Sequence, residues 1–106
     1  MDILQTKGQR FSRTSTTSAG GSVIVTEAAS TNRTHYVTEI GGSSPNAPAQ
    51  IRLYAGSTNY WMARVGDEGY EKVFKAPISI TTGSAVIVEV LHGSGSTYVN
   101  LAGFTI

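Results

Sequence analysis

Apolar and polar residues alternate along most of the chain, and this period of two is typical of β-strands. In the run 85–91, three apolar residues fall on one face, and two apolar residues and a glutamate fall on the other. The first set is Val86, Val88 and Val90, and the second is Ile87, Glu89 and Leu91. Apolar groups on both faces predict a central strand with one face partly covered. A glycine-serine link over 93–96 leads to the run 97–106, so the two runs predict a β-hairpin whose final strand closes the sheet.

Other segments alternate in the same way. The runs 50–54 and 59–65 flank a short glycine-containing link and predict a second hairpin. In the run 34–40, strict alternation places Ile40 on the same face as Tyr36. Further strands are predicted over 23–27, 70–75 and 78–80. The residues expected in the core are Val86, Val88, Val90, Ile51 and Leu53.

The segments between these runs are rich in glycine, proline and serine, and the longest covers 41–48. No segment of helical length carries apolar residues three and four positions apart. Many short strands with regular turn signals predict an all-β fold, an antiparallel β-sandwich of jelly-roll type. The strands number seven, or eight if part of 9–18 pairs. Pro77 lacks a backbone donor and is therefore expected at an edge or corner.

The first 18 residues differ from the rest of the chain, because they are polar, basic and rich in hydroxyl groups. They carry a formal charge of +2, whereas the other 88 residues carry −1. Such a segment buries little apolar area by itself. We therefore expect residues 1–18 to form an extended N-terminal arm, and residues 19–106 to form the β-sandwich domain.

The predicted arm supplies the first group of candidate binding residues. Lys7, Arg10 and Arg13 are its basic groups, and Phe11 is a possible apolar anchor. Arginine pairs well with carboxylates because its planar fork donates two parallel hydrogen bonds. These four residues are expected to order against the acidic or polar surface of a partner protein.

Composition limits the function classes that the chain fits. The 106 residues suit one domain, and a net charge of +1 gives no reason to expect a nucleic-acid partner. The sequence has no cysteine, which excludes disulfides and thiolate metal sites. It shows no apolar run of signal-peptide or membrane-spanning length, so we expect a soluble chain without a membrane partner or a cleaved leader. Only 14% of residues are charged, a composition that suits a protein docked to others.

Candidate catalytic and metal-binding groups are few. His35 and His92 are the only histidines, no Gly-x-Ser-x-Gly elbow accompanies them, and both are expected at the surface. Asp67, Glu68 and Glu71 surround a glycine turn, but their spacing matches no EF-hand loop. We expect a solvated acidic turn there. The sequence thus predicts no catalytic residue, no metal site and no cofactor, and the chain is not expected to be an enzyme.

Aromatic residues form the second group of candidate binding residues. Tyr54, Tyr60 and Trp61 fall on the two strands of the predicted 50–65 hairpin. Three interpretations stay open for them. Trp61 could pack in the core with Ala63 and Val65, the rings could form a protein interface, or exposed rings could stack on sugars.

Several segments of the chain resemble small jelly-roll structural proteins of tailed bacteriophages, of the capsid decoration or cement type. The resemblance extends over about residues 20–106. The segments that carry it are 23–25 after a Gly-Gly turn, 51–56, 72–78, 85–90 and 98–104.

This resemblance implies a virion structural protein that bridges neighbouring capsid subunits. It implies a homotrimer on the capsid surface, made in the host cytoplasm, with the major capsid protein as partner. Self-association also fits the low charge and the apolar positions on both faces of the predicted final hairpin, 85–106. The alternative function is a carbohydrate-binding module, or a β-sandwich module of the tail or neck.

Overall fold

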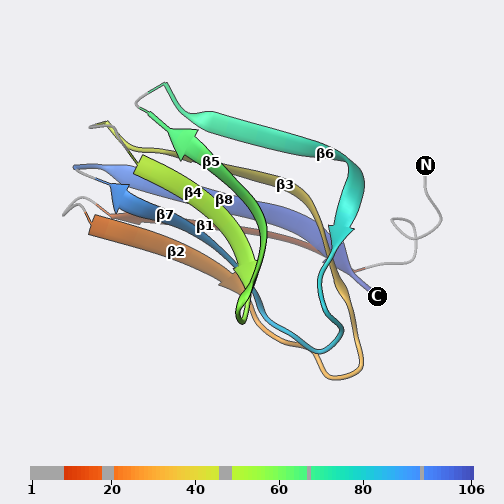
Figure 1. Cartoon of the computed structure of the whole chain (residues 1–106). Helices are drawn as coiled ribbons and strands as arrows, with labels where there is room; N and C mark the ends of the chain where they lie inside the picture. Colours follow the sequence, from red (N-terminus) through yellow and green to blue (C-terminus); the bar gives the residue numbers. More distant parts are fainter. Residues whose placement is uncertain (1–8, 18–20, 46–48, 67, 94) are drawn as a thin grey trace.

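The computed structural model describes residues 9–17, 21–45, 49–66, 68–93 and 95–106. These residues form eight strands and no helix (Figure 1). The strands are β1 Gln9–Thr17, β2 Gly21–Glu27, β3 His35–Ser43, β4 Ala49–Ala55, β5 Thr58–Val65, β6 Tyr70–Ser79, β7 Val86–Gly93 and β8 Thr97–Thr105. The described part of the chain contains no helix that is long and apolar enough to cross a membrane.

The strands form two antiparallel four-stranded sheets with jelly-roll topology. Sheet A has the order β1-β8-β3-β6, and sheet B has the order β2-β7-β4-β5. Sheet B lies in front of sheet A in Figure 1. Only β4 and β5 are consecutive strands of one sheet, so every other connection crosses from one sheet to the other. The predicted fold class is confirmed.

The core lies between the two sheets and is built from the alternating apolar positions. All five residues expected there are fully buried, with 0% of their surface exposed. Sheet A contributes Val37, Ile40, Val99 and Leu101 to the same cluster. On β7 the opposite face is only half-covered, as the two-sided apolar pattern predicted.

One predicted hairpin is correct and the other is wrong. Strands β4 and β5 pair directly, and Gly56 at their turn has a φ of 56°, a value that glycine adopts without strain. Strands β7 and β8, in contrast, lie in different sheets, and β8 is an inner strand of sheet A between β1 and β3. Alternation determines which face of a strand is buried but not which strand it pairs with, so the short 93–96 link suggested a pairing that does not form.

The predicted boundary between arm and sandwich is also wrong. Residues 9–17 form β1, which pairs with β8 from Gln9↔Thr105 to Thr17↔Thr97. Phe11 points inward and is 8% exposed, while hydroxyl-bearing neighbours face outward. The buried Phe11 ring is the only large apolar side chain of β1, and it anchors this edge strand to the core. The sandwich therefore begins at or before Gln9, and residues 1–8 lie outside the described part.

The run 34–40 does not alternate strictly, because β3 contains a β-bulge at Thr38. The register of β3 against β8 shifts between Val37↔Gly103 and Glu39↔Ala102. An extra residue in one strand reverses the faces beyond it. Val37 and Ile40 are consequently both buried, and the prediction that Ile40 shares a face with Tyr36 fails.

Side chains close the two sides of the sandwich. On one side, the Arg13 Nε of β1 lies 2.7 Å from the Glu27 Oε1 of β2. On the other side, Trp61 of β5 donates a hydrogen bond from Nε1 to the Tyr70 hydroxyl of β6, at 2.7 Å, and its ring meets the Phe74 ring edge-on. Strand β6 is an edge strand that bends near its end (Figure 1), so Pro77 is at an edge, as predicted.

Candidate functional site: an arginine-lined hollow

A hollow of about 380 Å³ opens where the edges of β1 and β2 meet the segment between β2 and β3. Three arginines and one glutamate line it, which gives it a formal charge of +2. The whole chain carries only +1, so positive charge is concentrated here. The charged lining residues are Arg10, Arg13, Arg33 and Glu27.

Arg13 and Glu27 form the fixed wall of the hollow. The Arg13 side chain is 55% exposed, whereas the Glu27 side chain is only 16% exposed. The hydrogen bond to Glu27, and then the charge of that carboxylate, raise the pKa of Arg13 above its ordinary value. The guanidinium therefore stays charged across the physiological range. One of its donors is already used, so Arg13 can contribute charge and its other donors to a ligand.

Arg33 belongs to the loop before β3 and is held less tightly. Its guanidinium donates to the Gln9 Oε1 at 3.5 Å and to the Thr105 carbonyl oxygen at 3.4 Å. Both distances are at the long limit for hydrogen bonds. A guanidinium has five N–H donors in a planar fork that matches a carboxylate. The Arg33 guanidinium can therefore reorient toward a bound anion, because only two long hydrogen bonds are lost.

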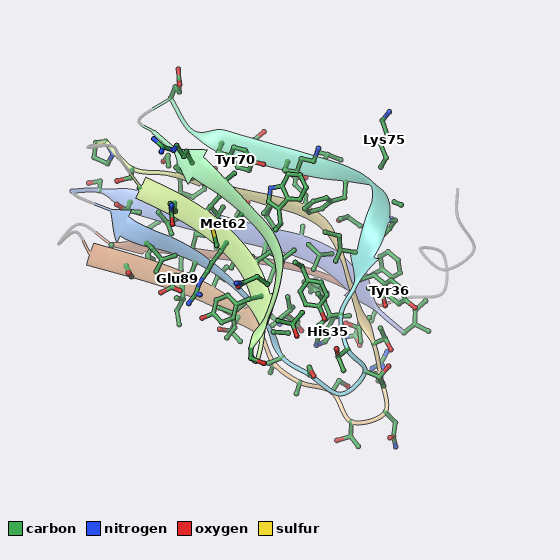
Figure 2. The ribbon with its side chains drawn as sticks, in the orientation of Figure 1. His35, Tyr36, Met62, Tyr70, Lys75 and Glu89 are labelled. Atoms are coloured by element: carbon green, nitrogen blue, oxygen red, sulfur yellow. The ribbon has the colours of Figure 1, made fainter. Side chains whose placement is uncertain are left out.

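The floor of the hollow is His35, at the start of β3 (Figure 2). This histidine is 2% exposed, so the prediction that it lies at the surface is wrong. The Ala28 carbonyl oxygen lies 2.7 Å from Nε2 and can only accept, so Nε2 donates to it. On the other ring nitrogen, Nδ1 lies 2.7 Å from the Thr105 hydroxyl. Both ring nitrogens therefore have hydrogen-bond partners. His35 links Ala28, where the loop after β2 begins, to Thr105 at the end of β8.

The structure brings together two of the four predicted partner-binding residues. Arg10 and Arg13 line the same hollow. Phe11 is not an exposed anchor, because it packs into the core with its ring 5.6 Å from the His35 ring, in an edge-on arrangement. Lys7 lies outside the described residues. Phe11 alternates with Arg10 along β1, and burial of the phenylalanine therefore directs the arginine outward.

Sequence reasoning missed Arg33 and Glu27 as parts of the site. They lie far from Arg10 in the sequence and reach it only because β1 and β2 form the edges of facing sheets. The concentration of charge in the first 18 residues indicated half of the site. Nothing in the local pattern around Arg33 indicates the other half.

The three candidate aromatic residues do not form an open platform. Trp61 and Tyr60 pack against the core, and the Lys72 ammonium lies 5.1 Å from the Trp61 ring centroid. The Arg52 guanidinium covers Tyr54 at 4.1 Å from its centroid. The Tyr60 hydroxyl is within hydrogen-bond distance of the Thr81 hydroxyl, at 3.2 Å. A sugar that stacked on the covered face of Tyr54 or Trp61 would have to displace a cation.

In the part of the acidic turn that the structure describes, no second site is found. The described residues contain no group of three or more histidine, aspartate or glutamate side chains placed to hold a metal ion. Glu68 and Glu71 border a shallow hollow with Tyr70 and Tyr98. Asp67 lies outside the described residues, as does the side chain of His92.

Comparisons with known proteins place the chain only at the level of fold. No protein-family model matches the sequence, and no curated protein matches it. Among solved structures, the Yersinia pseudotuberculosis-derived mitogen aligns with a TM-score of 0.47 at 14% identity, covering 92% of this chain and 86% of that one. PliG of Aeromonas hydrophila, a periplasmic inhibitor of g-type lysozyme, aligns with a TM-score of 0.42 at 10% identity, covering 93% and 89%.

Neither alignment supports an argument about function, because both TM-scores are below 0.5. Neither protein is described as a component of a virion, so the resemblance to phage jelly-roll proteins stays a prediction.

Proposed function

We propose that the chain is a binding protein of the capsid-decoration type, without enzymatic activity, that docks on an acidic segment of a neighbouring capsid protein. The arginine-lined hollow is the docking site. The protein is made in the host cytoplasm and then binds to the capsid surface. The observation that carries this proposal is that three arginines and one glutamate line a single hollow.

The chemistry of the hollow favours a carboxylate-bearing partner. A charge of +2 in a partly enclosed space attracts anions, and the concave walls reduce screening by solvent. Arg33 has the geometry to form a two-pronged contact with an aspartate or glutamate side chain. Ser12 and Ser30, which also line the hollow, supply hydroxyl donors for the remaining lone pairs.

The size of the hollow fits the end of a side chain rather than a whole folded element. A space of about 380 Å³ is at the small end of ligand-pocket volumes. One or two acidic side chains of a partner loop fill it, and the surrounding rim then contacts the loop backbone. Resemblance to cement proteins, which bridge neighbouring shell subunits, supports a capsid protein as the owner of that loop.

The affinity of one hollow is expected to be modest. Exposed ion pairs contribute about 0–1 kcal/mol each, because solvent screens them and side-chain entropy opposes them. Copies that are linked in one oligomer bind with a higher effective affinity, because the second hollow then binds at a high effective concentration. Charge contacts of this kind weaken as salt concentration rises.

Co-sedimentation of the purified protein with purified capsids tests the proposal. Arg33→Ala should lower the bound fraction, with an increase in dissociation constant of roughly twofold to fivefold for a lost surface charge pair. Lys75→Ala is the control, because Lys75 is an exposed cation of β6, the edge strand of sheet A farthest from β1. The control variant should bind like the wild type.

Two results would contradict the proposal. One is wild-type protein that stays in the supernatant at every salt concentration. The other is an Arg33→Ala protein, or an Arg10→Ala and Arg33→Ala double variant, that binds as tightly as the Lys75→Ala control.

A further inference from the structure

The outer face of sheet B exposes two of the four large apolar side chains that are exposed among the described residues, Ile24 and Met62. Ile24 on β2 is 49% exposed and Met62 on β5 is 51% exposed. Ile87 and Leu91 are partly exposed on β7, which lies between β2 and β5 in the order of the sheet. On the outer face of sheet A, β1 presents Ser12, Thr14 and Thr16 instead. These apolar residues are not one contiguous patch, but several exposed apolar residues on one face indicate an interaction surface better than a single exposed residue does.

One row of side chains crosses this face from edge to edge. Strand register aligns Ile24 with Glu89, Glu89 with Arg52, and Arg52 with Met62. Met62 and Glu89 are labelled on the nearer sheet in Figure 2. Arg52 donates to the Glu89 Oε1 from Nε at 3.1 Å and from Nη2 at 2.9 Å. The row therefore has apolar ends and a neutral ion pair in its centre.

We propose that this face binds the same face of a second copy of the chain, related by a two-fold axis that runs along the strands between β7 and β4. Such a rotation exchanges the two edges of the sheet and keeps the row at the same height. Ile24 of one copy then faces Met62 of the other. Glu89 of one copy likewise faces Arg52 of the other, so both contacts are complementary.

Charge and geometry favour a second copy over a strongly charged partner. The central pair is already neutral, so an acidic or basic surface gains little there, and Arg64 lies at the rim. A hydrogen bond to Glu89 is the main cause that raises the pKa of Arg52, which keeps this guanidinium charged on both copies. Two sheets pack face to face readily when their strands are nearly aligned. A contact of identical patches is the usual form of a homodimer.

The size of the face predicts a weak dimer. Four strands about 4.8 Å apart, each about seven residues long, cover roughly 20 by 23 Å. Stable interfaces bury about 800 Å² of accessible surface on each partner. This footprint of roughly 460 Å² is little more than half of that area, so weak association with a dissociation constant in the micromolar range is expected. The homotrimer implied by the phage resemblance stays a separate prediction that this face does not support.

Sedimentation velocity over a concentration series tests the proposal with single variants. The wild type should shift from the 11.2 kDa monomer toward twice that mass as its concentration rises through the micromolar range. Ile24→Lys and Met62→Glu should each raise the dissociation constant at least tenfold. Val73→Lys is the matched control, because Val73 is 66% exposed on sheet A, and it should leave association unchanged. Circular dichroism should show that all variants are folded.

A double variant tests the two-fold geometry itself. Within one chain, positions 24 and 62 are three strand spacings apart, roughly 14 Å, which is too far for a direct ion pair. Across the proposed axis the introduced lysine faces the introduced glutamate. The Ile24→Lys and Met62→Glu double variant should therefore dimerise better than either single variant.

The proposal does not depend on docking at the arginine-lined hollow, and the two can fail separately. A wild type that stays monomeric at 200 µM, roughly a hundredfold above low-micromolar affinity, would overturn it. So would a trimer, a Val73→Lys effect as large as that of Ile24→Lys, or a double variant without recovery. If the wild type is monomeric and Ile24→Lys lowers capsid binding, the face belongs to the capsid contact and the dimer proposal is wrong.

Discussion

Gly103 occupies the most crowded position of the fold, on β8 between β1 and β3. Its register partners are Phe11 on one side and Val37 on the other. A Cβ atom added here would overlap the Tyr36 carbonyl oxygen and lie 2.8 Å from the Phe11 Cζ. Backbone atoms cannot move aside as side-chain ends do. The close approach of three strands at this point therefore requires glycine.

Gly103→Ala should lower the free energy of unfolding by roughly 3 kcal/mol, at the upper end of overpacking costs in well-packed cores. Chemical denaturation measures the change. Gly66→Ala is the control, because no atom lies within 4 Å of a Cβ built at Gly66. Equal stability of the two variants would show that the strands around Gly103 are not packed as described.

Residue-scale prediction from sequence succeeded where a side chain's own strand determined its burial. The inward valines of β7 and the pair Ile51 and Leu53 were found by alternation alone. It failed at His35, because the hydrogen-bond partners that allow an imidazole to be buried, Ala28 and Thr105, come from other segments of the chain. A polar residue's burial depends on such partners, and a local pattern does not show them.

At the scale of elements, β1 is the main correction to the sequence interpretation. Its nine residues contain one large apolar side chain, and hydroxyl groups and two arginines make up much of the rest. Composition alone therefore indicated an arm. Pairing along the full length of β8 supplies backbone hydrogen bonds that composition does not reveal. Local periodicity does not predict which strands pair in the jelly roll, because pairing depends on contacts between residues far apart in the sequence. The separation of β7 from β8 is one example.

Removing residues 1–17 should abolish cooperative unfolding or lower the melting temperature strongly, because it deletes β1 and exposes the edge of β8. Phe11→Ala should destabilise by about 3–5 kcal/mol, the range for large aromatic truncations in cores. Thermal melts monitored by circular dichroism measure both. If the shortened chain melts like the full chain, β1 is not part of the cooperative unit. Residues 1–17 would then be an arm outside the folded domain.

At the scale of the whole molecule, two different surfaces carry the two proposed interactions. The positive hollow lies at the β1–β2 side, and the apolar row lies on the outer face of sheet B. Sequence composition predicted a protein that docks to others, and the first 18 residues indicated where positive charge gathers. The three-dimensional grouping of Arg10 with Arg33, and the alignment of Ile24 with Met62 in one row, required the fold.

The two surfaces combine into one expectation for a decorated capsid. A pair joined through sheet B carries two hollows, so it can contact two capsid subunits at once. Such bridging is what a cement protein does. The avidity of a two-site contact compensates for weak individual ion pairs.

A density map of capsids decorated with the protein tests the central claim most directly. The account predicts that carboxylate groups of a capsid subunit lie within ion-pair distance, about 4 Å, of the Arg10 and Arg33 guanidinium groups. Salt that releases the protein should remove this density while leaving the capsid intact. A map in which the protein is bound with its arginine-lined hollow open to solvent would contradict the account.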